Sequence, residues 1–296
     1  MTTALRPPPA PARPGAAAGR TAFAALAARE LRRFAINPVF LFAVGMTAWI
    51  LATDPGGKVP EIDAINGYPA ALLGGFGMMA TFWLTRSMRA SEPVTGVTPV
   101  TLPARTAALC AVAILPFGCG CLALLWFMRL HPVGESMYGA FSPSAQVAIL
   151  TGQIAVPALG GPLLGVALGR WVRFPGAAFV LFLIIFGWVN LATVPSLFHP
   201  DSVPVTVLRL FSPFAFFTLH VLHGDPSRIT AWRGSPWFFL GWQLALCTVA
   251  VLVALLRGAD GRLRSRITRA LMAVAAGAVI MLVLAGTGGF AHPVTV

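Results

Sequence analysis

The side chains that could perform chemistry in this chain are few, and we first consider possible metal ligands. His220 and His223 lie three residues apart beside Asp225, a spacing that could hold a metal ion, although many ordinary loops contain such a triplet. Cys119 and Cys121 are too closely spaced for a usual zinc pair, and no second pair of ligands follows them. We therefore expect no metal and no cofactor, and interpret the cysteines as small residues packed within helices.

Motifs of enzymes are also missing from the sequence. It contains no pattern typical of a zinc protease, a serine hydrolase or a zinc deaminase. A P-loop needs a lysine after its glycines, and Lys58, the only lysine, lies outside such a pattern. We predict that the chain is not an enzyme and that any ATP used by it is hydrolysed on a partner chain.

The elements that must position these residues are seven apolar segments separated by short polar loops. About 20 residues at a rise of about 1.5 Å cover the roughly 30 Å hydrocarbon core of a bilayer. The chain has 296 residues, of which 57% are hydrophobic and 10% charged, which leaves no room for a separate soluble domain. The sequence therefore predicts an all-α polytopic membrane protein. The expected spans are 36–53, 69–85, 107–127, 144–168, 177–197, 236–256 and 268–287.

Apart from Arg269, the second residue of the last span, no Asp, Glu, Lys, Arg or His falls inside these expected spans. Charged groups within a membrane usually serve proton or ion coupling, so their absence argues against a proton-driven carrier. The polar groups that remain are uncharged, and we interpret them as hydrogen-bond partners between helices. They include Gln146, Gln153, Asn190 and Gln243.

The net charge of +12 is distributed unevenly over the loops. With the N-terminus placed inside, sixteen basic residues lie on the inner side and five on the outer side. This bias predicts a cytoplasmic N-terminus. The basic surface then faces membrane lipids and cytoplasmic partners, and we expect no nucleic acid among the partners. Abundant Arg, Ala, Gly and Pro are compatible with a GC-rich bacterial source and hence a plasma membrane.

The first 35 residues divide into two predicted parts. Residues 1–20 are rich in Pro and Ala, and we predict a disordered cytoplasmic tail. Residues 21–35 predict an amphipathic helix on the inner membrane surface, ended by Asn37-Pro38. Glu30 interrupts its apolar face. The residues of this helix that we single out are Phe23, Leu26, Glu30, Arg33 and Phe34.

Two further stretches stand out near the end of the chain. Part of the outer loop 198–235 is largely apolar, and we expect the loop to dip into, or lie along, the outer interface. Residues 258–296 are expected to form a basic cytoplasmic loop followed by the extra span.

Gly161, Gly165 and Gly169 form a ladder of small residues, which predicts close helix packing within the chain or, alternatively, a dimer contact.

The inner loop between the second and third spans is the most specific stretch. It contains an acidic residue, a Thr-Pro-Val-Thr turn and a basic residue before the third span. These residues, with the two arginines that precede them, are Arg86, Arg89, Glu92, Thr98, Pro99, Val100 and Arg105. The loop resembles that of exporter-like (type-two) permease subunits of ATP-binding cassette transporters.

The resemblance implies a fold, a function and partners. It implies that the loop contacts a nucleotide-binding ATPase subunit, that residues 36–257 form a six-span permease domain, and that residues 21–35 form the interfacial elbow helix. The chain would pair with itself or with a second permease and export an amphipathic or hydrophobic substrate. The span 268–287 departs from the six-span family pattern. As alternatives, the loop arginines could serve only as topology determinants, and the protein could be a non-transporting membrane scaffold or regulatory subunit.

Overall fold

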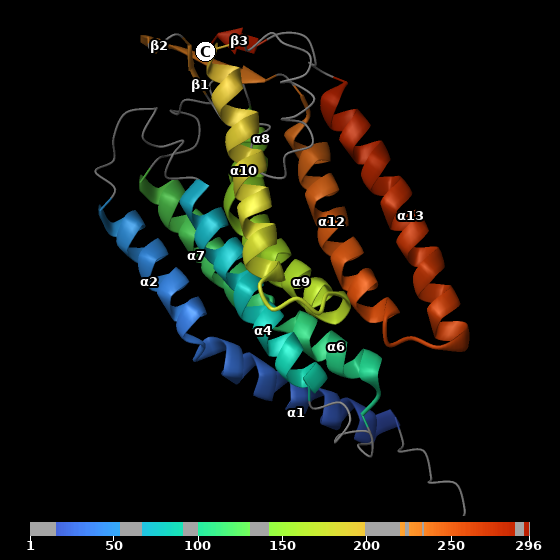
Figure 1. Cartoon of the computed structure of the whole chain (residues 1–296). Coiled ribbons are helices and arrows are strands. Elements are labelled where there is room, and N and C mark those ends of the chain that lie inside the picture. The colour runs from blue at the N-terminus through green and yellow to red at the C-terminus, as the bar shows by residue number, and fades with distance from the viewer. Residues whose placement is uncertain are drawn as a thin grey trace, which may run out of the picture.

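The chain forms a bundle of long helices in the computed structural model (Figure 1). Most of the helices run side by side, the first helix crosses one end of the bundle, and a small sheet lies at the other end (Figure 1). The structure describes residues 16–53, 67–90, 100–130, 142–198, 220–222, 225–232, 234–287 and 293–295.

The chain enters the bundle through two helices joined by a sharp bend. Helix α1 covers Ala16–Ala35 and α2 covers Pro38–Thr53, and their axes differ by 61°. The bend lies at Asn37, whose Oδ1 accepts a hydrogen bond from the backbone N of Val39 at 2.9 Å and so caps α2. Helix α1 begins at Ala16, five residues before the predicted helix and within the predicted tail 1–20, and residues 1–15 lie outside the described part.

Two irregularities interrupt the next helices, and the second has an identifiable cause. A π-helical segment, η1 (Ala70–Phe76), leads into α4 (Gly77–Ala90). Helices α6 (Leu102–Ala111) and α7 (Ile114–Leu130) are separated by a short turn. Because Pro116 has no N–H to offer the preceding turn, the chain closes tighter bonds there, from the N of Val112 to the O of Leu109 at 3.2 Å.

The second half of the chain contributes the remaining helices. A second π-helical segment, η2, interrupts the fourth apolar stretch immediately before Pro157. The elements in chain order are α8 (Pro143–Leu150), η2 (Thr151–Ala155), α9 (Val156–Trp171), α10 (Ala177–Phe198), α12 (Pro236–Leu256) and α13 (Gly261–Gly286).

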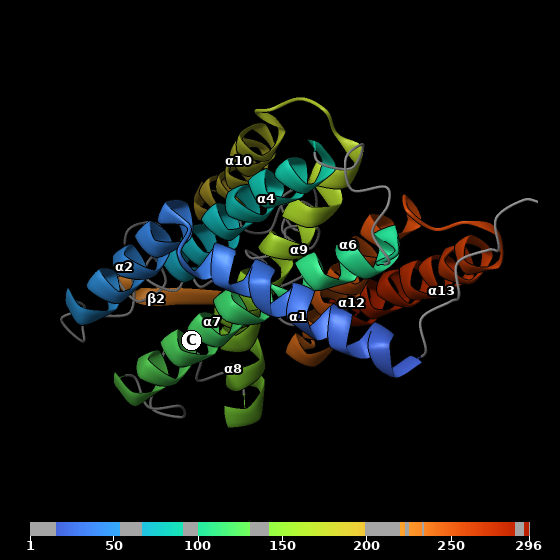
Figure 2. The same cartoon turned by 90° about the horizontal axis from the view of Figure 1, so that it is seen from below.

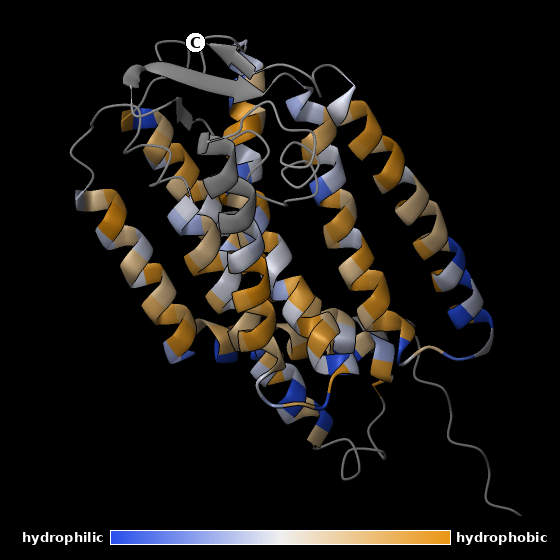
Figure 3. Cartoon of the chain, turned by 45° about the horizontal axis from the view of Figure 1, so that its top comes forward, coloured by the Kyte–Doolittle hydropathy of each residue, from blue (hydrophilic) through white to orange (hydrophobic). Residues whose placement is uncertain are grey.

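Several of these helices could cross a membrane. By length and composition, four spans within the described residues qualify, and a fifth is added if the bent pair α1 and α2 counts as one. The qualifying spans are Leu102–Leu130, Pro143–Trp171, Pro236–Leu256 and Gly261–Gly286. Apolar residues line the helices, and the most hydrophilic ones gather mainly near the end that α1 crosses (Figure 3). The predicted class, a helical protein suited to a membrane, is thereby confirmed.

A small antiparallel sheet accompanies the helices. Strand β2 (Asp225–Trp232) pairs with β1 (His220–Leu222) and with β3 (Pro293–Thr295). Thr230 pairs with Thr295, so the sheet joins the loop before α12 to the segment after α13. We predicted that the loop 198–235 lies along or dips into the outer interface, and we did not predict strands β1 and β2 within it. Residues 199–219 lie outside the described part.

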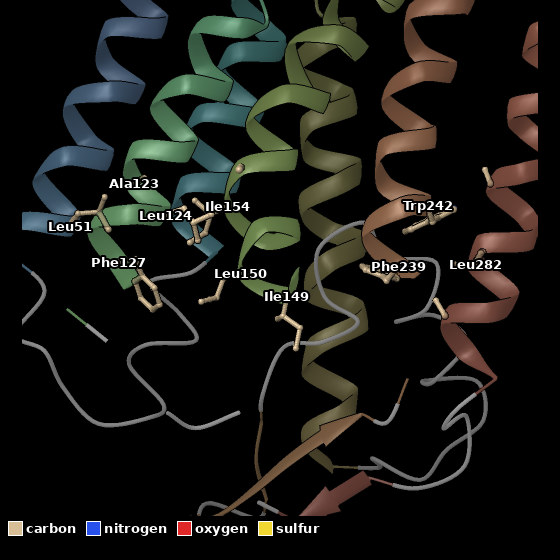
Figure 4. Close-up of a cluster of buried hydrophobic side chains, with 13 residues drawn as sticks. Leu51, Ala123, Leu124, Phe127, Ile149, Leu150, Ile154, Phe239, Trp242 and Leu282 are labelled. Carbon is tan, nitrogen blue, oxygen red and sulfur yellow. The ribbon is translucent and has the colours of Figure 1, made fainter. Parts of the chain in front are cut away.

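The apolar core has two main parts. One part lies toward the end of the bundle opposite α1 and joins α2, α7, α8, η2, α12 and α13 through residues such as Leu51, Phe127, Ile154 and Trp242 (Figure 4). The other part lies beside α1 and includes Phe34, which is fully buried. Helix α1 is therefore part of the core and is not merely attached to it.

Candidate functional site

The candidate site is the end of the bundle that α1 crosses. Helix α1 packs mainly against α6 and also contacts α2 and α4, and the view from below shows it running across the ends of its neighbours (Figure 2). The loop that the sequence singles out leaves from the end of α4 and returns at the start of α6. The two predicted features, α1 and the ends of this loop, therefore meet on one surface.

An ion pair on α1 extends to α4. Arg33 Nη1 donates to both carboxylate oxygens of Glu30, at 3.2 and 3.0 Å, and Arg33 Nη2 donates to Ser87 Oγ at 3.1 Å. Glu30 is only 6% exposed, so its charge faces the bundle and not solvent. A buried carboxylate needs such a partner because desolvation alone would disfavour its charge. Arg33 thus holds the acidic group and at the same time fastens α1 to the last turn of α4.

The apolar residues predicted on α1 divide according to their distance from the bend. Phe34 is fully buried, and its ring centroid lies 4.4 Å from that of Phe40 on α2. Leu26 is half-buried and Phe23 is exposed. Burial therefore increases along α1 toward α2, and the part nearer the N-terminus keeps an apolar surface free.

The two arginines at the end of α4 are both half-buried. The guanidinium of Arg86 lies over two aromatic rings of its own helix, 5.8 Å from the centroid of Phe82 and 5.7 Å from that of Trp83. Cation–π contacts of this kind hold a positive charge against an apolar helix end. Arg86 is therefore ordered at the point where the loop begins.

The loop returns to the bundle at α6. Thr101 is extended and acts as the N-cap of α6, Pro103 follows in the first turn, and Val100 and Arg105 are half-buried. Thr106 is fully buried and donates to the O of Leu102 at 3.0 Å. The remaining predicted loop residues, Glu92, Thr98 and Pro99, lie outside the described residues, so the site is described at its two ends.

A charged residue that the sequence interpretation missed lies at the same end. Arg170, in the last turn of α9, is only 1% exposed, although it stands two residues beyond the expected span. The neighbouring Trp171 donates from Nε1 to the O of Val253 at 2.9 Å, and the guanidinium of Arg257 lies 5.5 Å from its ring centroid. These contacts tie the ends of α9 and α12 together. The only signal in the sequence was the position of Arg170 directly after the glycine ladder.

The glycine ladder of α9 faces η1 and α4. A Cβ atom added at Gly161 would collide with the backbone of Gly74, one at Gly165 would collide with the backbone of Met78, and one at Gly169 would lie 2.7 Å from Thr85 Cβ. Small residues permit this approach of two backbones, which dispersion then stabilises in lipid. The structure therefore uses the ladder as a contact within the chain.

Polar side chains also join the helices, both at this contact and between α12 and η2. Thr81 Oγ1 on α4 lies 2.8 Å from the O of Pro162 on α9, and Gln243 Nε2 on α12 donates to the O of Gly152 in η2 at 3.0 Å. A backbone carbonyl oxygen has two lone pairs, so it can accept a side-chain hydrogen bond in addition to the one from its own helix. The interpretation of Gln243 as a hydrogen-bond partner between helices agrees with this geometry.

His223 of the triplet His220, His223 and Asp225 lies outside the described residues, so the structure does not test a metal site there. Among the residues that the structure describes, no group of three His, Cys, Asp or Glu side chains is arranged to hold a metal ion. Helix α1, the end of α4 and the start of α6 form one connected surface. In comparisons with protein-family models, curated proteins and solved structures, nothing matches the chain.

Proposed function

We propose that the chain is the membrane-spanning permease subunit of an ATP-binding cassette transporter and exports an amphipathic or hydrophobic substrate. The observation that carries the proposal is the hydrogen bond from Arg33 on α1 to Ser87 on α4. It joins the helix that resembles an elbow helix to the end of the loop that resembles a coupling loop. A nucleotide-binding subunit docked there would displace both elements together.

The energy source is assigned to a second chain. The sequence has a single lysine and no P-loop, so ATP must be bound and hydrolysed by the partner. Two permeases, as a homodimer or a heterodimer, would form the path along their interface. Closure of the partner ATPases would switch that path between two states by moving a connected inner surface.

The proposed topology has six core spans and a seventh. The core comprises the helices between residues 36 and 257, and α13 is the additional span. The N-terminus lies in the cytoplasm of a bacterial cell, because the arginine-rich ends of the helices gather on the α1 side. The basic end is then the one that a cytoplasmic ATPase would meet.

The test is a reconstitution with a matched pair of hydroxyl deletions. Tagged protein is purified from its native membrane, the retained P-loop ATPase is identified by mass spectrometry, and transport per ATP hydrolysed is measured in proteoliposomes. Ser87→Ala removes the acceptor for Arg33 and should lower transport per ATP about fivefold, since an exposed hydrogen bond contributes about 1 kcal/mol. Retention of the ATPase should be unchanged.

Thr53→Ala is the control for this experiment. Thr53 is exposed at the other end of α2, and its hydroxyl bonds carbonyls of its own helix, with the nearest at 2.9 Å. The variant Thr53→Ala should therefore show the same transport per ATP hydrolysed as the wild type. If no P-loop ATPase is retained, the scaffold alternative gains and the transport proposal fails. If Ser87→Ala couples like Thr53→Ala, the proposed route through α1 is wrong.

A further inference from the structure

The structure points to a second functional surface, which lies on helix α13 and is separate from the surface formed by α1, α4 and α6. Ile267, Ala278 and Leu282 are buried, on the face that packs against α12. At 100° per residue, Arg262 and its neighbours at i+4 and i+7 lie on the opposite face, pointing away from the bundle. These neighbours are Arg266 and Arg269, and all three arginines are exposed.

The same exposed face continues as an apolar strip. Ala273, Ala276, Gly277 and Ile280 follow the arginines along it, and nothing lies within 4 Å of a Cβ added at Gly277. Only 11% of the apolar window of α13 is buried inside the structure. The strip directly beyond the arginines is therefore apolar, made largely of small residues, and not covered by other described parts of the chain at Gly277.

The arginines are free to bind an anion. Among the described residues, Arg262, Arg266 and Arg269 have no hydrogen bond or ion pair, and Asp260 at the start of α13 pairs with none of them. Guanidinium groups bind phosphate in a bidentate fashion, and basic residues next to a membrane helix attract anionic headgroups. An apolar strip that begins where the charges end suits a lipid, whereas a free phosphate would gain nothing from it.

We propose that this face of α13 binds one anionic phospholipid, with the phosphate held by Arg262, Arg266 and Arg269 and an acyl chain on the strip from Ala273 to Ile280. The site extends beyond the proposed function, since it would operate equally in a transporter or in a scaffold. Lipid binding tests this site and retention of an ATPase tests the proposed function, so the failure of one proposal can be distinguished from the failure of the other.

The test is native mass spectrometry of the full chain, delipidated and then titrated with phosphatidylglycerol or with phosphatidylcholine of the same acyl chains. The wild type should bind one phosphatidylglycerol at least tenfold more tightly than phosphatidylcholine. The triple variant Arg262→Gln, Arg266→Gln, Arg269→Gln should lose this preference and keep its thermal stability, because these exposed side chains make no hydrogen bond or ion pair with the described residues.

The control variant removes the same charge elsewhere. Arg29→Gln, Arg32→Gln, Arg173→Gln changes three exposed arginines on other elements and should keep the tenfold preference. An equal loss in both variants would show a bulk charge effect and overturn the site, as would an unchanged preference in the triple variant. A dimer of this chain that the triple variant breaks, without lipid selectivity, would assign the face to a second copy and also overturn the proposal.

Discussion

Arg33 on α1 and Ser87 on α4 are 54 residues apart in the sequence, yet Nη2 of the first lies 3.1 Å from Oγ of the second. The same guanidinium holds the buried carboxylate of Glu30. A single side chain therefore links the helix at the end of the bundle to the helix from which the inner loop departs. In the proposed transporter, this contact and the packing of Phe34 would carry a movement of α1 to α4.

Removing either partner of the Glu30–Arg33 pair should have unequal effects on stability. Arg33→Gln leaves a nearly buried carboxylate without its cation, while Glu30→Gln leaves an arginine whose side chain is 39% exposed and can reach water. We expect Arg33→Gln to lower the free energy of unfolding by about 1–3 kcal/mol and Glu30→Gln by less. The double variant should recover part of the loss. Thermal unfolding in detergent measures this, and equal losses in the two single variants would contradict the assigned burial of Glu30.

A methyl group added to the glycine ladder should separate α9 from η1. Gly161→Ala places its Cβ against the backbone of Gly74, which cannot move aside as a flexible side chain could. We expect a loss of about 1–3 kcal/mol, typical of overpacking. Gly118→Ala is the matched control, because nothing lies within 4 Å of its added Cβ and alanine favours a helix. If both variants unfold at the wild-type temperature, the close α9–η1 contact is wrong.

Gln243 should contribute to the contact between α12 and the second π-helical segment. Gln243→Leu removes the hydrogen bond to the O of Gly152, which contributes about 1 kcal/mol in a membrane helix pair. Thr248→Val provides the comparison, since the Thr248 hydroxyl is exposed and bonds only its own helix, at Leu244. The difference in unfolding temperature between the two variants measures the bond. A larger loss for Thr248→Val would contradict the geometry.

The proposed topology places opposite ends of the helices on opposite sides of the membrane. Cysteines introduced at Ala28 and Arg173 should react with a membrane-impermeant maleimide only after the cells are opened. Cysteines at Thr53 and Thr287 should react in intact cells; all four positions are exposed. The unmodified chain controls for the native cysteines, which lie within the apolar helices. Labelling of Ala28→Cys in intact cells would reverse the orientation.

Segment hydropathy anticipated the positions of the helices but not always their ends. The segment 236–256 coincides with α12, because Ser235 and Pro236 start the helix where the apolar run begins. The segment 144–168 stopped before Arg170, whereas α9 continues through Trp171 and buries that arginine. A hydropathy window ends at the first charged residue, whereas a helix continues for as long as its backbone hydrogen bonds are formed.

Non-local features were beyond a local interpretation of the sequence. The pairing of Thr230 with Thr295 joins segments separated by two helices, and no periodicity in either segment announces it. The π-helical segments η1 and η2 both contact α9, and no pattern of residues in the sequence indicated them. In contrast, the bend at Asn37-Pro38 and the helix from residue 21 follow from local chemistry and were predicted.

Site-specific cross-linking tests the central claim most directly. A photoreactive residue is placed at Ala90, the exposed last residue of α4, and in a separate variant at Thr287, the exposed residue after α13 at the other end of the bundle. After illumination of native membranes, Ala90 should be joined to a P-loop ATPase identified by mass spectrometry, and Thr287 should not. If no ATPase is captured from Ala90, or if both positions capture it equally, the proposed docking of an ATPase on the α1 end of the bundle is contradicted.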